Sequence, residues 1–318
     1  MGSDQGGSIM LSSLIASVVF GQAVNLISSA GTIYQEPVSF AFAPSGTQFV
    51  AGMADSTIKI FDAKTRQVIR KFDLPGRPFQ CPAVAWSPSG GRIAAGAENA
   101  SIHIFPLAGG KPITLTGHLR PIQALNFDKT GKKLVSTGQD DVIRVWDLNK
   151  NKSVLTILGK GVNVYFAKFD NSGTKLICAT LGKGIQIYNS TTGQLIRSMG
   201  GHGGLGVNNA DINSTFTRAV SAGRDAKLSI WNPTNGQKLR DCIGHKDWVI
   251  NVAVSPNGKY IASSGADGTV KVWKMDSGAS VGSMDRMSFV GSPLAWSASS
   301  GYLLTMDEMN KLKVLIVR

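Results

Sequence analysis

Residues that carry catalytic or metal chemistry are scarce in this sequence. The three cysteines, Cys81, Cys178 and Cys242, lie too far apart to indicate a disulfide framework or a paired zinc motif. There are four histidines, and none stands in an H-E-x-x-H motif. The G-x-x-x-x-G-K-[ST] and G-x-S-x-G motifs are also missing. We therefore predict no catalytic residue, no metal site and no cofactor, and we expect the cysteines to be small buried residues.

Long apolar runs and acidic residues are also few. The apolar run 10–23 has 14 residues, whereas a helix needs about 20 to cross a bilayer, so we predict no transmembrane segment. Asp and Glu number 20 against 33 Lys and Arg, which gives a net charge of +13. This imbalance is compatible with acidic proteins, nucleic acid or an anionic membrane as partners.

An aromatic residue recurs along the chain at intervals of 44, 41, 42, 43 and 42 residues, at Phe61, Phe105, Trp146, Tyr188, Trp231 and Trp273. A period of about 40–45 residues is typical of a propeller blade, a four-stranded unit that buries its apolar faces only against neighbouring blades. No Pro-rich or Gly/Ser-rich linker interrupts the period. The repeat therefore favours one domain over two.

Aligned on these aromatic residues, the chain divides into seven repeats. Each has two strands joined by a Gly-containing or polar turn, a third strand that carries the aromatic residue, and an outer strand. Third strands are predicted at 56–62, 100–105, 141–147, 183–188, 226–231, 268–273 and 310–317, the last with Leu315 at the aromatic position. Outer strands are predicted at 67–72, 112–117, 153–158, 194–199, 238–244 and 279–284.

This pattern resembles the WD-repeat β-propeller family over nearly the whole chain. The resemblance implies an all-β fold, a seven-bladed β-propeller of four-stranded antiparallel blades. It also implies a hydrogen-bonded set of four structural side chains, in which the buried indole, hydroxyl and imidazole groups each find a partner. Three repeats carry the set complete: His118, Ser136, Asp140 and Trp146; His202, Ser221, Asp225 and Trp231; His245, Ser263, Asp267 and Trp273.

The other repeats depart from this set. The repeat of Phe61 keeps Asp55 without a histidine, those of Phe105 and Tyr188 lack both the His and the Asp, and the last lacks the His and the aromatic residue. We expect His103, on a third strand, to be structural as well. Three blades would then be braced by hydrogen bonds and four held mainly by packing.

Propellers of this family close when a strand from the start of the chain joins the last blade and so hides exposed sheet edges. The repeat spacing places this strand at 23–30. We therefore predict a single propeller over residues 23–318, with residues 1–22 outside it.

Residues 1–22 have two interpretations. The first eight residues resemble an expression tag, and the apolar run after them resembles a secretory signal that ends near the small residues Gly21 and Ala23. No Lys or Arg precedes the run, which favours the alternative of an apolar strand or helix packed on the propeller. The first interpretation predicts a secreted or periplasmic protein, and the second a cytoplasmic one.

The resemblance implies a monomeric, noncatalytic scaffold that binds other proteins. Two alternatives remain: a subunit of an RNA- or DNA-associated complex, and a propeller that binds a small ligand in its central channel. In a propeller, the turns between first and second and between third and fourth strands share one face, here named the lower face. It carries basic residues that could bind an acidic partner or phosphate backbone, or simply keep the turns soluble: Lys64, Arg66, Lys129, Lys132, Lys133, Lys150 and Lys152.

The opposite face, named the upper face, consists of the loops that lead into first strands and the turns after second strands. Partners of this family mostly bind there, so the resemblance points to its polar and aromatic residues. Trp248 is the leading candidate, because tryptophan is enriched at binding hot spots, although it could instead fold over its own blade. The candidates on this face are Arg77, Phe79, Arg120, Gln139, Leu205, Arg224, Lys246, Trp248 and Asn251.

Overall fold

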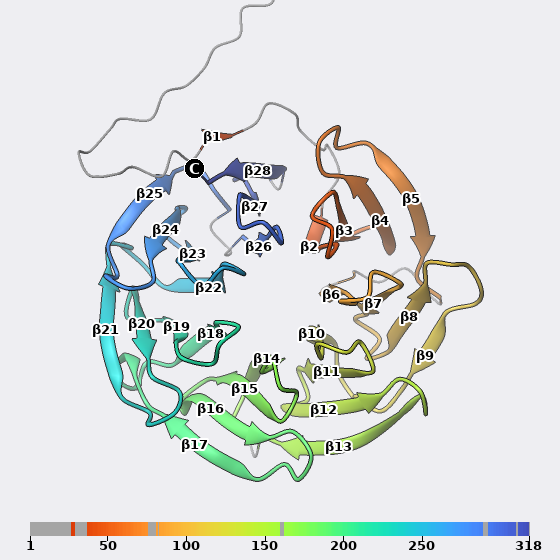
Figure 1. The fold of residues 1–318 in the computed structure, drawn as a ribbon, viewed down its shortest axis with the longest axis horizontal. Helices are drawn as coiled ribbons and strands as arrows, with labels where there is room; N and C mark the ends of the chain where they lie inside the picture. Colours follow the sequence, from red (N-terminus) through yellow and green to blue (C-terminus); the bar gives the residue numbers. More distant parts are fainter. Residues whose placement is uncertain are drawn as a thin grey trace, which may run out of the picture.

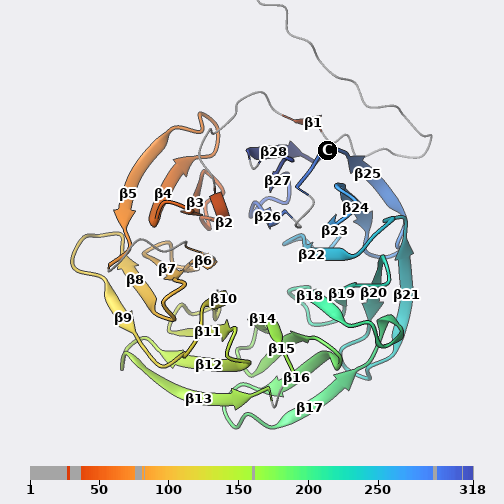
Figure 2. The same cartoon turned by 180° about the vertical axis from the view of Figure 1, so that it is seen from behind.

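Seven four-stranded antiparallel sheets follow one another around a ring (Figure 1). The computed structural model describes residues 27–28, 37–75, 81, 83–159, 162–288, 292–309 and 311–317. Figures 1 and 2 show that each blade begins with its innermost strand near the centre and ends with its outer strand at the rim. The predicted fold class, a seven-bladed all-β propeller, is confirmed.

Blade 1 comprises β2 (Pro37–Phe42), β3 (Gln48–Met53), β4 (Thr57–Asp62) and β5 (Val68–Asp73), and blade 2 comprises β6 (Ala83–Trp86), β7 (Arg92–Gly96), β8 (Ile102–Pro106) and β9 (Ile113–Leu115). Blade 3 comprises β10 (Ile122–Phe127), β11 (Lys133–Gly138), β12 (Val142–Asp147) and β13 (Lys152–Leu158), and blade 4 comprises β14 (Val164–Phe169), β15 (Lys175–Thr180), β16 (Gly184–Asn189) and β17 (Leu195–Met199). Each third strand overlaps the range predicted from the aromatic repeat.

Blade 5 comprises β18 (Val207–Ile212), β19 (Ala219–Gly223), β20 (Lys227–Trp231) and β21 (Lys238–Ile243), and blade 6 comprises β22 (Val249–Val254), β23 (Tyr260–Gly265), β24 (Val270–Lys274) and β25 (Ser280–Met284). Blade 7 comprises β26 (Ala295–Trp296), β27 (Tyr302–Met306), β28 (Leu312–Ile316) and β1 (Ile27–Ser28). In blade 7, β1 pairs antiparallel with β28, Ile27 lying opposite Ile316. A single turn of 3-10 helix, η1 (His202–Gly204), precedes β18. No helix in the described ranges is long and apolar enough to cross a membrane.

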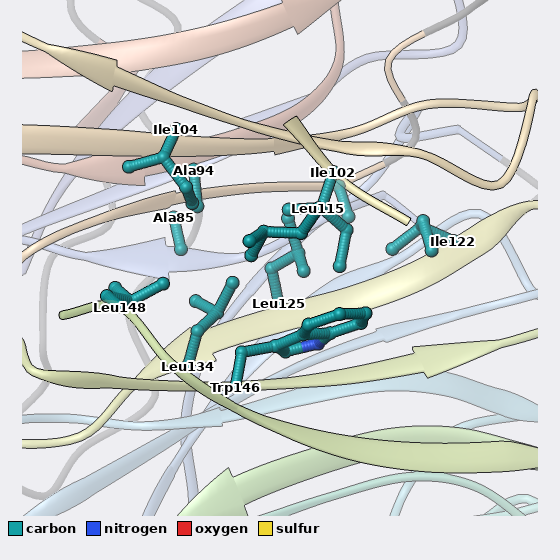
Figure 3. Close-up of a cluster of buried hydrophobic side chains, with 11 residues drawn as sticks. Ala85, Ala94, Ile102, Ile104, Leu115, Ile122, Leu125, Leu134, Trp146 and Leu148 are labelled. Atoms are coloured by element: carbon teal, nitrogen blue, oxygen red, sulfur yellow. The ribbon is translucent and has the colours of Figure 1, made fainter. Parts of the chain in front are cut away.

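The core is divided into seven clusters of buried side chains, and each lies between two neighbouring blades. Figure 3 shows the cluster between blades 2 and 3, where Ala85, Ala94 and Ile104 face Leu134 and Trp146. Another cluster joins blade 7 to blade 1 and so completes the circle of packing. A blade therefore buries its apolar faces only when both of its neighbours are present.

The recurring aromatic residues belong to these clusters. Trp146 packs against blade 2, Trp231 against blade 4 and Trp273 against blade 5, so each indole is buried in the interface with the preceding blade. Phe61 and Phe105 occupy the equivalent interfaces with blades 7 and 1. The repeat period is thus the period of the packing between blades.

The second and third strands of the blades are largely buried, whereas the outer strands β5, β13, β17, β21 and β25 are more exposed. This difference is clear in blade 3, where β11 is almost wholly buried and every second side chain of β13 faces solvent. The cysteines are free and buried, as predicted. Burial raises the pKa of the Cys81 and Cys242 thiols to about 12, so neither is a thiolate at neutral pH.

Candidate interaction surface on the upper face

The loops of the upper face are fixed by the sets of four polar side chains. In blade 3, Trp146 Nε1 donates to Ser136 Oγ over 2.8 Å, and Ser136 Oγ lies 2.7 Å from His118 Nε2. His118 Nδ1 lies 3.0 Å from the carboxylate of Asp140. The chain of bonds therefore runs from the buried third strand to a loop and a turn at the surface.

The carboxylate at the end of this chain also holds the loop backbone. Asp140 accepts a hydrogen bond from the N–H of Leu119 over 2.9 Å, and Asp267 accepts one from Lys246 over the same distance. Equivalent contacts, all between 2.7 and 3.1 Å, join the other two sets, His202, Ser221, Asp225 and Trp231, and His245, Ser263, Asp267 and Trp273.

In the sets of blades 3 and 6, the pKa values of both the imidazole and the carboxylate are lowered. Burial lowers the pKa of His118 and His245 and outweighs the neighbouring carboxylates, which raise it. Burial by itself would raise the pKa of Asp140 and Asp267, but hydrogen bonds from backbone N–H groups and from the histidines hold it below its ordinary value. His118 and His245 are therefore neutral, and Asp140 and Asp267 ionised, at neutral pH in the folded protein.

We expect the free energy of unfolding to decrease as the pH falls from 7 to 5. Below the ordinary histidine pKa of about 6.5, the unfolded chain binds protons at positions 118 and 245, whereas the folded chain resists them because these pKa values are lowered. The stabilisation is present above pH 6.5 and is lost as the pH falls towards the folded-state values. The aspartates add a further loss only below about pH 3.8. Urea unfolding at pH 7, 6 and 5 measures the effect.

The matched variant for this prediction is the double substitution His118→Gln and His245→Gln. Its unfolding free energy should depend less steeply on pH between 7 and 5 than that of the wild type. Some dependence should remain, since burial also lowers the pKa of His103. An unchanged slope would show that these two histidines do not resist protonation.

His103 belongs to a polar chain that the sequence analysis did not find. Its Nε2 lies 2.8 Å from Ser101 Oγ and its Nδ1 lies 3.1 Å from Thr114 Oγ1, while Ser101 contacts Asn99. Asn99 stands at the position of the aspartate in other repeats, six residues before the aromatic Phe105. Blade 2 is therefore also braced by side-chain hydrogen bonds. The sequence feature that could have predicted this is the amide of Asn99 at a position where other repeats have a carboxylate.

Trp248 stacks against the neighbouring blade rather than against its own. The guanidinium carbon of Arg224, in the turn between β19 and β20, lies 4.7 Å from the centroid of the indole ring. Arg224 Nε donates to Asn208 Oδ1 over 3.0 Å, and the Asn208 amide donates to the Val249 carbonyl over 2.8 Å. The stack bridges blades 5 and 6, yet Trp248 stays 46% exposed.

Large apolar side chains are exposed on three of the loops that lead into first strands, and Met309 is 66% exposed in the turn between β27 and β28. Leu119, Leu205 and Trp248 are 85%, 58% and 46% exposed, and they lie on the loops that lead into β10, β18 and β22. Each loop follows a Gly-His pair whose histidine belongs to a polar set. Leu119 was not among the sequence candidates, although its place directly after His118 matches that of Lys246 after His245.

A cavity of about 410 Å³, named the upper chamber, lies where the inner strands begin. It brings together three of the predicted residues, Gln139, Arg224 and Asn251. Lys246 and Arg120 are exposed but do not line it. The predicted candidates Arg77 and Phe79 lie outside the described residues.

Asn251 has contacts on both sides within the ring. Its Oδ1 accepts a hydrogen bond from Asn209 in blade 5 over 2.9 Å, and its Nδ2 donates to the Ser292 carbonyl in blade 7 over 3.1 Å. The Asn126 amide donates in the same way to the Ala167 carbonyl of the next blade over 2.8 Å. Polar residues of the inner strands therefore tie neighbouring blades together around the channel.

The second chamber of the channel, about 490 Å³, contains an ion pair that sequence analysis missed. Lys168 Nζ lies 2.8 Å from Asp211 Oδ1. Asp211 also accepts hydrogen bonds from the N–H of Val254 over 2.8 Å and from that of Ile212 over 2.7 Å. The carboxylate thus joins blades 4, 5 and 6. No three His, Cys, Asp or Glu residues of the described ranges are grouped so that they could hold a metal ion.

The lower face carries the predicted basic residues, partly balanced by acidic ones. Lys64, Lys129, Lys132, Lys150 and Lys152 are exposed, while Arg66 and Lys133 are half-buried. The N–H of Leu148 donates to the Lys132 carbonyl over 2.9 Å, which joins the two turns of blade 3. Lys150 lies 3.9 Å from Asp147, and Lys238 lies 3.0 Å from Asp241. Because carboxylates accompany these lysines, the lower face is less positive than a count of its lysines suggests.

Comparison with known proteins gives relatives that match about a third of the chain. The COMPASS component SWD3 of Saccharomyces cerevisiae is 32% identical over 115 residues, which are 36% of this chain and 36% of that protein. The transcription factor unc-37 of Caenorhabditis elegans is 28% identical over 123 residues, 35% of this chain and 19% of that protein. Protein groucho of Drosophila melanogaster is 29% identical over 105 residues, 32% of this chain and 14% of that protein. The aligned part thus spans about a third or less of each relative's length.

Two family models match the chain. The WD domain, G-beta repeat, matches residues 193–232, which contain β17 to β20, and residues 236–274, which contain β21 to β24. Each match therefore joins the outer strand of one blade to the first three strands of the next. The nucleolar protein 10-like N-terminal domain, a β-propeller, matches residues 21–193, more than half of the 318 residues. The chain therefore belongs to the WD-repeat β-propellers, in the family of the nucleolar protein 10-like N-terminal domain.

Proposed function

We propose that this propeller is a noncatalytic scaffold that binds another protein on its upper face. The observation that carries the proposal is the arrangement of Leu119, Leu205 and Trp248, three exposed apolar side chains on loops that follow the Gly-His pairs. Side chains held in place before binding lose little conformational entropy in a complex. A rigid ring with exposed apolar anchors is therefore suited to protein recognition.

The histidines support a noncatalytic role. His118, His202 and His245 each bridge a serine and an aspartate, and His103 bridges a serine and a threonine. A general base needs access to a substrate proton, but these imidazoles are buried and engaged on both nitrogens. The relatives give similar support, since the name of the yeast protein describes it as a component of COMPASS.

The Trp248→Ala variant tests this proposal. Proteins from a lysate of the native host are captured on wild-type and variant propellers and quantified by mass spectrometry. Loss of a hot-spot tryptophan costs about 2 kcal/mol or more of binding free energy, which weakens affinity roughly 30-fold. We therefore expect the amount of the principal partner recovered at limiting bait to fall strongly with Trp248→Ala.

Tyr302→Ala is the matched control. Tyr302 is an aromatic residue 45% exposed, close to the value for Trp248, but it begins β27 on the side of the lower face. Its replacement should leave the captured proteins unchanged. Identical capture by wild type and Trp248→Ala, with both variants folded by circular dichroism, would exclude the upper face near Trp248 as the docking surface.

A further inference from the structure

The charged side chain that lines the upper chamber is positive. It is lined by the first residues of β10, β14, β18 and β22 and by turn residues Gln139 and Arg224. Among these lining residues Arg224 is the only one with a charged side chain, and the others are amides, aromatic or apolar groups. Its volume of about 410 Å³ lies within the range of about 300–1,000 Å³ that is typical of ligand pockets.

Arg224 is held in position before any ligand binds. Its guanidinium group rests on the Trp248 ring at 4.7 Å, and its Nε donates to Asn208, which is itself fixed by the Val249 carbonyl. Within the described part of the chain, neither terminal nitrogen of this guanidinium donates to another side chain or carbonyl. A fixed guanidinium with two free terminal nitrogens matches the geometry of a carboxylate, which it can bind through two parallel hydrogen bonds.

Two residues that line the chamber also carry hydrogen-bond acceptors that lack partners. Gln123 Oε1 and Asn209 Oδ1 are buried, and no described residue donates to either atom. A buried carbonyl oxygen without a donor costs free energy, which a ligand that carries N–H groups would recover. An extended peptide supplies such N–H groups from its backbone.

We propose that the upper chamber binds an acidic segment of a partner protein, with a Glu or Asp carboxylate on Arg224 and backbone N–H groups near Gln123 and Asn209. Leu205 and Trp248 lie beside Arg224. The Arg224 N–H donates to the carbonyl of Gly206, the residue after Leu205, and the Arg224 guanidinium rests on the Trp248 ring. Both side chains can therefore provide apolar contacts next to the carboxylate site. The net charge of +13 favours the approach of an acidic segment. This inference rests on the proposed docking function of the upper face and specifies its ligand.

The test uses pools of nine-residue peptides with randomised positions around a fixed central residue. The central residue is Glu, Gln, Lys or phosphoserine, and binding to the whole chain is measured by fluorescence polarisation at 0.15 M salt. We expect the Glu pool to bind at least about fivefold more tightly than the Gln pool, which has the same shape without the charge. Arg224→Gln should weaken binding of the Glu pool about tenfold or more and leave the Gln pool nearly unchanged.

Two variants separate a specific carboxylate site from general attraction. Arg120→Gln removes one positive charge from the same face but outside the chamber, and it should change binding of the Glu pool by less than about threefold. Arg224→Lys keeps the charge without the paired nitrogens, and its affinity should lie between those of wild type and Arg224→Gln. Thermal melting within a few degrees of the wild type confirms that Arg224→Gln is folded.

Three results would overturn the inference: equal binding of the Glu and Gln pools, equal losses in Arg224→Gln and Arg120→Gln, or a phosphoserine pool that binds more than tenfold better than the Glu pool. The last would assign the chamber to a phosphorylated segment instead. The docking function is tested separately, because protein capture that depends on Trp248 but not on Arg224 would keep the docking face and reject only the carboxylate site.

Discussion

Replacing Trp146 with alanine should lower the free energy of unfolding by about 3–5 kcal/mol, the usual cost of removing a large aromatic side chain from a core. Trp146 is 1% exposed and fills the interface between blades 2 and 3. The substitution also removes the indole N–H that donates to Ser136. Because a single interface is shared by two blades, the loss should appear as a shift of the whole denaturation curve, measured in urea by tryptophan fluorescence and circular dichroism.

Trp146→Phe is the control that separates packing from hydrogen bonding. Phenylalanine keeps an aromatic ring in the cluster but cannot donate to Ser136, so we expect a loss of about 1–2 kcal/mol. The natural phenylalanine at the same repeat position in blade 1, Phe61, shows that the ring can be accommodated there. A loss below about 1 kcal/mol for Trp146→Ala would contradict the assignment of this residue to the interface core.

Replacing Asp211 with alanine should cost about 2–4 kcal/mol of stability. The substitution leaves the buried N–H of Val254 without an acceptor and removes the ion partner of Lys168. An unsatisfied buried donor costs about 1–3 kcal/mol. The partly exposed Lys168 adds a smaller amount, because water screens its charge. Thermal and urea unfolding measure the change.

Asp211→Asn provides the comparison for this prediction. The amide oxygen of asparagine can still accept from Val254, so about half of the stability should be retained. If Asp211→Ala and Asp211→Asn lose the same amount, the ion pair with Lys168 carries the effect. If neither variant is less stable than the wild type, the carboxylate does not join the three blades.

Much of the propeller could be predicted from the repeat alone. Each blade is built from strands that are neighbours in sequence, so the alternation of apolar residues and the turn residues specify it locally. The third strand around Trp146, predicted at 141–147, is observed as β12 (Val142–Asp147). Leu315, predicted at the aromatic position of the last repeat, packs in the interface between blades 6 and 7.

The upper face was predicted only in part. The predicted topology correctly placed Trp248 and Arg224 on the same face. It did not predict that they stack, because the two residues belong to different blades and a strand pattern does not specify how loop side chains meet. Leu119 was overlooked for a similar reason, since an isolated leucine in a loop has no periodic signal. Asn251 lines the upper chamber as well, but both ends of its amide hold neighbouring blades.

The sequence by itself determined the seven repeats, the order of strands and the residues of the three His–Ser–Asp–Trp sets, since these depend on contacts within one repeat. Only the tertiary structure decided what lies between repeats: the Arg224–Trp248 stack, the Lys168–Asp211 pair and the upper chamber with its two unpaired acceptors. Asn209 and Asn251 are 42 residues apart and occupy equivalent positions in successive repeats. The period places them in register, but whether their side chains touch depends on how closely the closed ring brings its inner strands together.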